Sequence, residues 1–224
     1  MAFKNRTDAG HQLAQALASY RDQQTVVFAL PRGGVVVAAE VAFALDSPLD
    51  LLLVRKIGVP QQPELAMGAV VDGGAPLVVR NEDVISAAEV SESEFKVVCN
   101  RELAEIERRR KQYLGNREPL DVTGRTAIII DDGIATGATV RAGLRATRLR
   151  KPAKLVLAVP VAPTDTIAQL RAEADVVVCL EEHAFFGAIG FYYSDFRQVS
   201  DKKVINTLKR FPMRPAVNSN KPAA

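Results

Sequence analysis

Residues 126–150 read TAIIIDDGIATGATVRAGLRATRLR, and they place an acidic, glycine-containing loop between two regular elements. The apolar run at 127–130 is typical of a buried strand, and the residues after Thr139 follow a helical pattern. Between them, the small residues at 135–139 let successive backbone N–H groups converge on one anion, toward which the helix also directs the positive end of its dipole. The segment therefore predicts a phosphate-binding loop.

Two carboxylates at the start of this loop predict a sugar beside the phosphate. Asp131 and Asp132 end the strand at the edge where open α/β sheets bind ligands, and carboxylates there accept hydrogen bonds from a diol. Thr136 and Thr139 add hydroxyl donors, so the loop describes a ribose 5-phosphate site. The GxxxxGK[ST] and GxGxxG patterns are both absent, which disfavours the commoner nucleotide motifs. The competing interpretation is an ordinary turn, because Asp, Gly and Thr are frequent turn and cap residues.

The rest of the chain alternates short runs rich in Val, Ile and Leu with longer helical patterns. This alternation predicts an α/β fold with a mostly parallel central sheet and helices on both faces. The expected strands are residues 25–30, 49–54, 66–71, 77–80, 126–131, 154–161 and 175–180. Asp72-Gly73-Gly74 predicts a hairpin between the third and fourth of them, and the capping-box pattern of Ser91 and Glu94 predicts one helix over 91–114. We expect a single domain over residues 1–211 and a disordered tail over 212–224.

Composition excludes several other classes of protein. Of 224 residues, 48% are hydrophobic and 25% are charged, which excludes a disordered or fibrous chain. The net charge of +3 does not resemble a nucleic-acid footprint. No apolar run is long enough to span a membrane, and the start MAFKNRTDAGH has no apolar signal region, so we expect a cytoplasmic protein with neither nucleic acid nor membrane as partner. Cys99 and Cys179 have no close Cys or His partner in the sequence and are expected to be reduced packing residues.

The stretch AIIIDDGIATGAT at residues 127–139 resembles the 5-phosphoribosyl 1-pyrophosphate loop of type I phosphoribosyltransferases. The element order over residues 1–211 agrees with that family, with a weaker likeness outside the loop. The resemblance implies that Asp131 and Asp132 are the catalytic pair and hold the 2′- and 3′-hydroxyls of the ribose. It also implies that the loop residues wrap the 5′-phosphate, and these are Gly133, Ala135, Thr136, Gly137, Ala138 and Thr139.

Two further segments resemble the family's pyrophosphate site. Leu30-Pro31-Arg32-Gly33-Gly34 follows the first strand and is similar to the family's pyrophosphate loop, in which glycines let the backbone approach a ligand closely. Arg55-Lys56, interpreted as the end of the second strand, resembles the basic pair that contacts pyrophosphate in several members. The implied pyrophosphate-binding residues are Arg32, Gly33, Arg55 and Lys56; a plain turn and solvated strand-end cations are the alternatives. The family often has a strained peptide bond in the first segment, and the sequence leaves open whether Arg32–Gly33 is cis.

The resemblance also implies a lid and a small C-terminal hood. Residues 59–66, VPQQPELA, take the place of the mobile loop that closes over the reaction centre, and Glu64 within it is interpreted as a solvent-exposed carboxylate. The aromatic stretch at 183–193 takes the place of the hood that covers the nucleobase, with Phe185, Phe186 and Tyr192 as the base-stacking candidates. A hydrophobic plug over the sheet edge is the alternative for this stretch.

These expectations describe a phosphoribosyltransferase that moves the 5-phosphoribosyl group from phosphoribosyl pyrophosphate to a nitrogen acceptor, a nucleobase, and releases pyrophosphate. Mg²⁺ is the implied cofactor, held chiefly by substrate and water, and no protein metal ligand is assigned. Ala135 stands where members acting on 6-oxopurines commonly have an aspartate, which makes the loop more similar to adenine- and uracil-type members and leaves the acceptor open. Because members are often dimers, a homodimer is expected by analogy.

Two other functions stay open at this point. A non-catalytic regulatory protein that binds phosphoribosyl pyrophosphate would share the fold and the loop, although Arg32, Arg55 and Lys56 favour catalysis. A hydrolase or nucleotidase with Asp131 as nucleophile is disfavoured, because the sequence offers no nearby general base.

Overall fold

A computed structural model of the chain describes residues 3–21, 23–72 and 76–211. Its centre is a five-stranded sheet with the spatial order β2-β1-β6-β7-β8, in which every pair of neighbours is parallel. The strands are β1 (Thr25–Ala29), β2 (Leu49–Leu51), β6 (Thr126–Ile130), β7 (Lys154–Pro163) and β8 (Val176–His183). The expected α/β fold with a mostly parallel sheet is confirmed.

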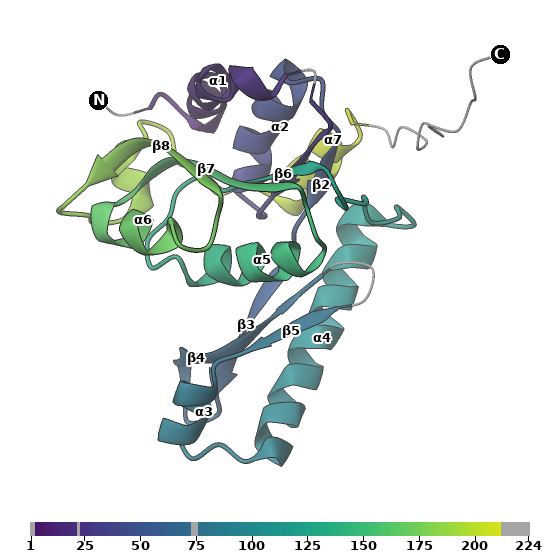
Figure 1. Ribbon diagram of the computed structural model, residues 1–224, viewed down its shortest axis with the longest axis vertical. Coiled ribbons are helices and arrows are strands. Elements are labelled where there is room, and N and C mark those ends of the chain that lie inside the picture. The colour runs from purple at the N-terminus through teal and green to yellow at the C-terminus, as the bar shows by residue number, and fades with distance from the viewer. Residues whose placement is uncertain (1–2, 22, 73–75, 212–224) are drawn as a thin grey trace.

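Helices cover both faces of this sheet, as Figure 1 shows. On one face lie α1 (Arg6–Ala16), α2 (Gly34–Ala44) and α7 (Asp201–Leu208); on the other lie α5 (Ala138–Leu149) and α6 (Thr164–Leu170). Alternate strand residues serve opposite faces: Ile128 and Ile130 join the first core, and Ile129 joins the second. Because both faces are covered, β1 and β6 are buried at every position, which explains why they read as unbroken apolar runs.

The strand order creates a point where two connections leave the sheet in opposite directions. From β1 the chain crosses through α2 to β2, whereas from β6 it crosses through α5 to β7 on the other side. The loops that follow these adjacent strands therefore meet at one edge, and the backbone N–H of Leu30 donates to the carbonyl of Ile130 at 2.9 Å. Such a switch point is where open α/β sheets bind ligands.

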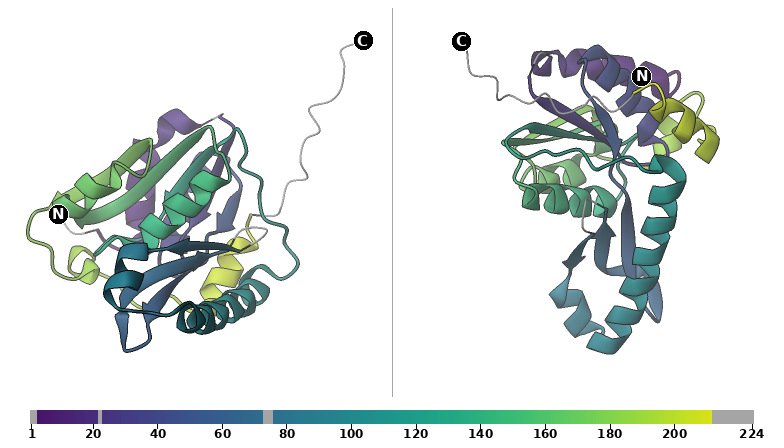
Figure 2. Two further views of the ribbon diagram at one scale, coloured as in Figure 1. Left: turned by 60° about the horizontal axis from the view of Figure 1, so that its bottom comes forward. Right: turned by 90° about the vertical axis from the view of Figure 1, so that its right-hand side faces the viewer.

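A second unit projects from the parallel sheet as an arm (Figures 1 and 2). It consists of the antiparallel strands β3 (Val54–Val59), β4 (Gln62–Val71) and β5 (Leu77–Arg80) with α3 (Glu82–Ala87) and α4 (Glu92–Leu114). The arm has its own apolar core, formed around Ile57, Met67 and Phe95. The expected pairing of 66–71 with 77–80 is confirmed by the β4–β5 ladder, while the turn residues 73–75 lie outside the described part of the chain.

The long helix α4 joins the arm to the body. Its capping box is present, since the Ser91 side chain accepts from the backbone N–H of Glu94 while the Glu94 side chain accepts from the N–H of Ser91. At its other end, Tyr113 and Leu114 pack into the same core as residues of α2 and α7. The expected single helix over 91–114 is therefore confirmed, with Ser91 as its N-cap.

Two expectations in the arm region need correction. The strand expected over 49–54 is wrong in its second half, because β2 ends at Leu51 and Val54 begins β3 in the other sheet. Residues 59–66, expected to be a lid loop, form the end of the β3–β4 hairpin, with Val59 opposite Gln62. Pro63 has no backbone N–H to donate. It is tolerated there because β5 pairs only with Gly68–Val71, so no hydrogen bond from residue 63 to β5 is needed. Closure of this segment over the site stays a prediction.

The hood follows β8 and is joined to the N-terminal segment. Phe3 donates its N–H to the carbonyl of Tyr192, and its own carbonyl accepts from the N–H of Ser194, both at 2.8 Å. Phe3 and Tyr193 are buried in a small cluster against Val161 of β7. The tail expected at 212–224 lies outside the described residues. Within the described ranges, none of the helices combines the length and apolar character that crossing a lipid bilayer requires.

Candidate active site

The loop after β6 is exposed on the side away from the core. Ala135, Thr136, Ala138 and Thr139 are all exposed, whereas Gly137 is buried. Gly137 has φ +73°, a left-handed conformation that glycine adopts without strain, and a Cβ there would lie 2.9 Å from Cγ2 of Thr166. In the described chain the backbone N–H groups of residues 135–140 donate to no backbone acceptor. The loop thus presents unengaged donors and the N-terminus of α5 at the sheet edge, an arrangement that binds anions.

The acid pair lies at the root of this loop, against the backbone of the loop after β1. Asp132 is buried, and a Cβ added to Gly33 would lie only 1.8 Å from its Oδ2 atom. Likewise, a Cβ on Gly34 would lie 2.9 Å from Cα of Asp131. The two glycines are therefore required by the close contact between the loops, not by their own backbone angles.

The electrostatics of the acid pair are asymmetric. Burial and the neighbouring Asp132 carboxylate raise the pKa of Asp131 well above its ordinary value, although the Asp131 Oδ1 atom accepts from the Asp132 N–H at 2.9 Å. Asp132 instead forms an ion pair with Arg6, whose Nε lies 2.6 Å from Oδ2. The pair therefore carries more negative charge than its surroundings offset, which favours a cation or hydroxyl donors beside it.

The loop after β1 contains a cis peptide bond between Pro31 and Arg32. The expectation concerned Arg32–Gly33, and the structure places the unusual bond one residue earlier. The Arg32 side chain is partly exposed and has its NH1 atom 3.5 Å from Oδ1 of Asp201, at the start of α7. The Tyr113 hydroxyl donates to the same oxygen at 2.5 Å, and burial together with this contact raises the pKa of Tyr113 to about 12.

Arg55 and Lys56 belong to β3 and point to opposite faces of it, as successive strand residues do. Arg55 lines a small cavity together with Pro31 and Thr139, next to the phosphate loop, and its NH2 atom lies 2.7 Å from the buried Glu102. Lys56 instead contacts Glu64 in the hairpin, at 3.0 Å between Nζ and Oε2. The interpretation of Glu64 as exposed is confirmed by its 99% exposed side chain. The structure thus brings Arg55 to the site and does not place Lys56 there.

The aromatic residues of the hood divide into packed and exposed ones. Phe186 and Tyr192 stack with ring centroids 4.9 Å apart, and the ring centroid of His183 lies 4.4 Å from that of Tyr192. Phe185 is 97% exposed. A Cβ on Gly133 would lie 2.6 Å from Cγ2 of Ile189, so the hood reaches the start of the phosphate loop.

Three side chains at the site were missed by the sequence analysis. Arg6 pairs with Asp132, the Tyr193 hydroxyl donates to the Asp132 carbonyl at 2.5 Å, and the Thr166 hydroxyl donates to the Ala135 carbonyl at 3.1 Å. Tyr193 lay in the aromatic stretch that drew attention, but Arg6 and Thr166 lie in segments that the sequence analysis assigned to no site. Only the folded chain brings them to the loop.

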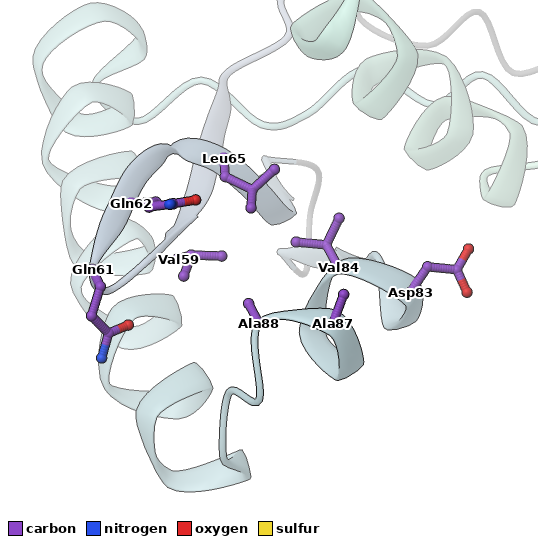
Figure 3. Close-up of a pocket in the computed structure, with 8 residues that line it drawn as sticks. All are labelled: Val59, Gln61, Gln62, Leu65, Asp83, Val84, Ala87 and Ala88. Atoms are coloured by element: carbon purple, nitrogen blue, oxygen red, sulfur yellow. The ribbon is translucent and has the colours of Figure 1, made fainter.

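A larger cavity, of about 660 Å³, lies in the arm and contains none of the predicted site residues. It is formed between the β3–β4 hairpin and α3, with Val59, Leu65 and Val84 facing the space (Figure 3). Its lining is mostly apolar and offers one carboxylate, Asp83, so it lacks the converging donors that the phosphate loop has. Among the described residues, no group of three or more His, Cys, Asp or Glu side chains is arranged to hold a metal ion.

Comparisons with known proteins agree with this geometry. The profile of the phosphoribosyl transferase domain matches residues 4–195. Two proteins from Mycobacterium tuberculosis strains, each provisionally named a phosphoribosyl transferase, are 46% identical over 208 residues, or 93% of this chain. The chain spans about half the length of these relatives, since the match covers 46% of each.

A solved structure covers almost the same length as this chain. The crystal structure of TT1426 from Thermus thermophilus is 39% identical, has a TM-score of 0.84, and matches over 94% of this chain and 99% of that one. The domain match, which includes both loops at the switch point, shows the family. The chain belongs to the phosphoribosyl transferase domain family.

Proposed function

We propose that this chain transfers the 5-phosphoribosyl group from phosphoribosyl pyrophosphate to a ring nitrogen of a nucleobase and releases pyrophosphate. One observation carries the proposal: the backbone at Gly33 lies against the Asp132 carboxylate, at the root of the exposed loop with unengaged amides. The donor carries a phosphate at one end of its ribose and a pyrophosphate at the other. Its binding site therefore needs two anion-binding loops, and between them side chains that accept hydrogen bonds from the ribose hydroxyls.

Each proposed role follows from the position of the residue. The amides and hydroxyls of residues 133–139 hold the 5′-phosphate, and Asp131 and Asp132 accept from the ribose hydroxyls. Arg32 and the Gly33 backbone bind pyrophosphate, and Arg55 is near enough to join them. Arg32 and Arg55 are each held by a carboxylate, Asp201 and Glu102, so both guanidiniums are positioned before the donor arrives. Lys56 would join only if the hairpin moved.

The reaction breaks the bond between C1 of the ribose and the pyrophosphate oxygen, whose electron pair leaves with pyrophosphate. A bond forms from C1 to the acceptor nitrogen, and the proton of that nitrogen passes to solvent. Positive charge develops on the ribose ring as pyrophosphate leaves, and the fixed carboxylates of Asp131 and Asp132 stabilise it. The two adjacent carboxylates, with no cage of three ligands among the described residues, fit Mg²⁺ held mainly by substrate oxygens and water. When bound, Mg²⁺ would supply neutralisation of the leaving pyrophosphate.

The hood supports a flat acceptor but does not select one. The stacked pair Phe186 and Tyr192 offers an aromatic edge beside Ile189, which touches the start of the phosphate loop. Ala135 supplies no carboxylate at the position where it would meet a base nitrogen. We therefore propose an adenine- or uracil-type acceptor ahead of a 6-oxopurine. The homodimer and the cytoplasmic location stay predictions.

The proposal predicts Mg²⁺-dependent release of pyrophosphate from phosphoribosyl pyrophosphate when the correct base is added. A panel of adenine, uracil, hypoxanthine and guanine, with a base-free control, measures this directly. We expect one base to raise the release rate by at least about a hundredfold over the base-free control, because transfer is a positioned two-substrate reaction.

Two other outcomes would contradict the proposal. Tight donor binding without turnover on any base would identify a regulatory binding protein. Release of phosphate from nucleotides without an acceptor would identify a hydrolase.

A further inference from the structure

An arginine from the first turn of α1 is anchored beside the acid pair by three contacts. Its Nε atom donates to Asp132 Oδ2 at 2.6 Å, and its NH1 atom donates to the carbonyl of Arg197 at 2.9 Å. Its guanidinium also lies over the ring of Phe196, 3.8 Å from the centroid. The Arg6 side chain is only 10% exposed, so these contacts hold a planar group in one orientation inside the protein.

Asp132 is in turn held both at its carboxylate and at its backbone carbonyl. Its Oδ2 atom is enclosed between Arg6 Nε and the backbone at Gly33, where a Cβ would lie 1.8 Å from Oδ2 and 3.0 Å from Nε. Its backbone carbonyl accepts from the Tyr193 hydroxyl at 2.5 Å. Because Oδ2 is already committed, a sugar hydroxyl bound by Asp132 has to reach Oδ1.

Arg6 also places a positive charge against one member of the acid pair. Two adjacent carboxylates in a buried site repel each other, and a cation in contact with one of them offsets part of this repulsion. Arg6 forms this contact with Asp132, while Asp131 has no ion-pair partner among the described residues. Without Arg6, the Asp132 carboxylate would lose both its cation and the charge-assisted contact that fixes Oδ2, so its orientation toward a hydroxyl would no longer be set.

We propose that Arg6 is a positioning residue for the ribose of the donor: it holds Oδ2 of Asp132 so that Oδ1 is presented in a fixed orientation to a sugar hydroxyl. This inference rests on the proposed function, because it assumes that the acid pair meets the ribose. It gives the N-terminal segment a part in substrate recognition that acts through Asp132. The same contacts predict that the effect is confined to the sugar, since the hydrogen bonds and the ring contact of Arg6 in the described chain go to Asp132, Arg197 and Phe196 and not to the 135–139 loop.

Calorimetric titration of the full chain with two ligands tests this. Arg6→Gln is expected to weaken binding of ribose 5-phosphate by about tenfold to a hundredfold, the loss typical of a hydrogen bond to a charged group, and to leave binding of inorganic phosphate unchanged. Arg6→Lys keeps the charge but not the planar fork, so it should restore part of the ribose 5-phosphate affinity. Arg171→Gln, which removes an exposed arginine–carboxylate pair with Glu182, should change neither affinity.

Each other result overturns the inference. Equal affinity of Arg6→Gln and wild type for ribose 5-phosphate would show that Arg6 does not position the acid. A parallel loss of both ligands would show that it merely supports the fold of the site. If Arg6→Gln does not fold, the affinity of Arg6→Lys for ribose 5-phosphate is the deciding measurement. An affinity of Arg6→Lys equal to that of the wild type would overturn the requirement for a planar guanidinium. Wild-type protein that binds inorganic phosphate but not ribose 5-phosphate would instead refute the proposed function itself.

Discussion

Asp131→Asn is expected to lower phosphoribosyl transfer by at least about a hundredfold while making the ligand-free protein more stable at neutral pH. The loss of activity follows because Asn removes the negative charge that stabilises the developing positive charge on the ribose. The variant keeps an oxygen that can accept the 2.9 Å hydrogen bond from the Asp132 N–H, so the loop has no reason to collapse. Activity and stability are therefore predicted to change in opposite directions.

The stability gain has a defined pH dependence. Burial and Asp132 raise the folded-state pKa of Asp131 above its unfolded value, so the folded protein binds more protons than the unfolded chain between these two pKa values. The wild type therefore loses stability as pH rises through the folded pKa, whereas Asp131→Asn does not. The advantage of the variant should grow with rising pH and reach the order of 1 kcal/mol at neutrality, a size common for substitutions that relieve a functional site.

Denaturant unfolding from pH 4 to pH 8, together with pyrophosphate release, measures both effects. Asp121→Asn is the control of opposite sign, because hydrogen bonds from Thr123 lower the pKa of Asp121 and its charge stabilises the fold above the unfolded pKa. If Asp131→Asn is less stable than the wild type at pH 8, the Asp131 charge does not destabilise the fold. If the variant is fully active, the charge is not used in transfer.

Gly33→Ala is expected to reduce donor binding by at least about a hundredfold and to destabilise the protein by about 1–3 kcal/mol, the range for overpacking a close contact. Gly33 has φ −62°, which alanine adopts readily, so backbone strain is not the cause. The cause is the added Cβ, which would lie 1.8 Å from Oδ2 and 2.4 Å from Cγ of Asp132. Relief requires the two loops to separate, and that separation removes the geometry proposed for the donor.

A double-mutant cycle with Asp132→Ala isolates this contact. Removing the Asp132 carboxylate also removes the clash, so Gly33→Ala should cost much less unfolding free energy in the Asp132→Ala background than in the wild type. Calorimetric donor binding and denaturant unfolding give the two readouts. Equal costs in both backgrounds would mean that Gly33 meets something other than Asp132.

The elements that the sequence predicted well are those with a local cause. The strand at 126–130, the helix that follows the glycine-containing loop and the capped α4 each follow from a few neighbouring residues: an unbroken apolar run, a helical pattern after small residues, and the reciprocal Ser91–Glu94 pair. The parallel sheet follows from the alternation of such runs with helices.

The arm could not be predicted because it depends on a change of sheet. Leu52 and Leu53 continue the apolar run of β2, yet they pack into different cores before β3 starts. The periodicity of apolar residues therefore does not show that the chain leaves the parallel sheet after Leu51. As a result Arg55 and Lys56 were assigned to one site, although a strand directs them to opposite faces. Arg6 was missed for a related reason, since its contact with Asp132 joins residues 126 positions apart.

The central claim is that the loops after β1 and β6 hold a phosphorylated ribose between them. A crystal structure of the chain with phosphoribosyl pyrophosphate and Mg²⁺ tests it most directly. We predict the 5′-phosphate within hydrogen-bond distance of the amides of residues 135–139, a ribose hydroxyl on an oxygen of Asp131 or Asp132, and the pyrophosphate beside Gly33. A donor bound in the arm cavity, or a phosphate loop with its amides turned away from the ligand, would contradict the account.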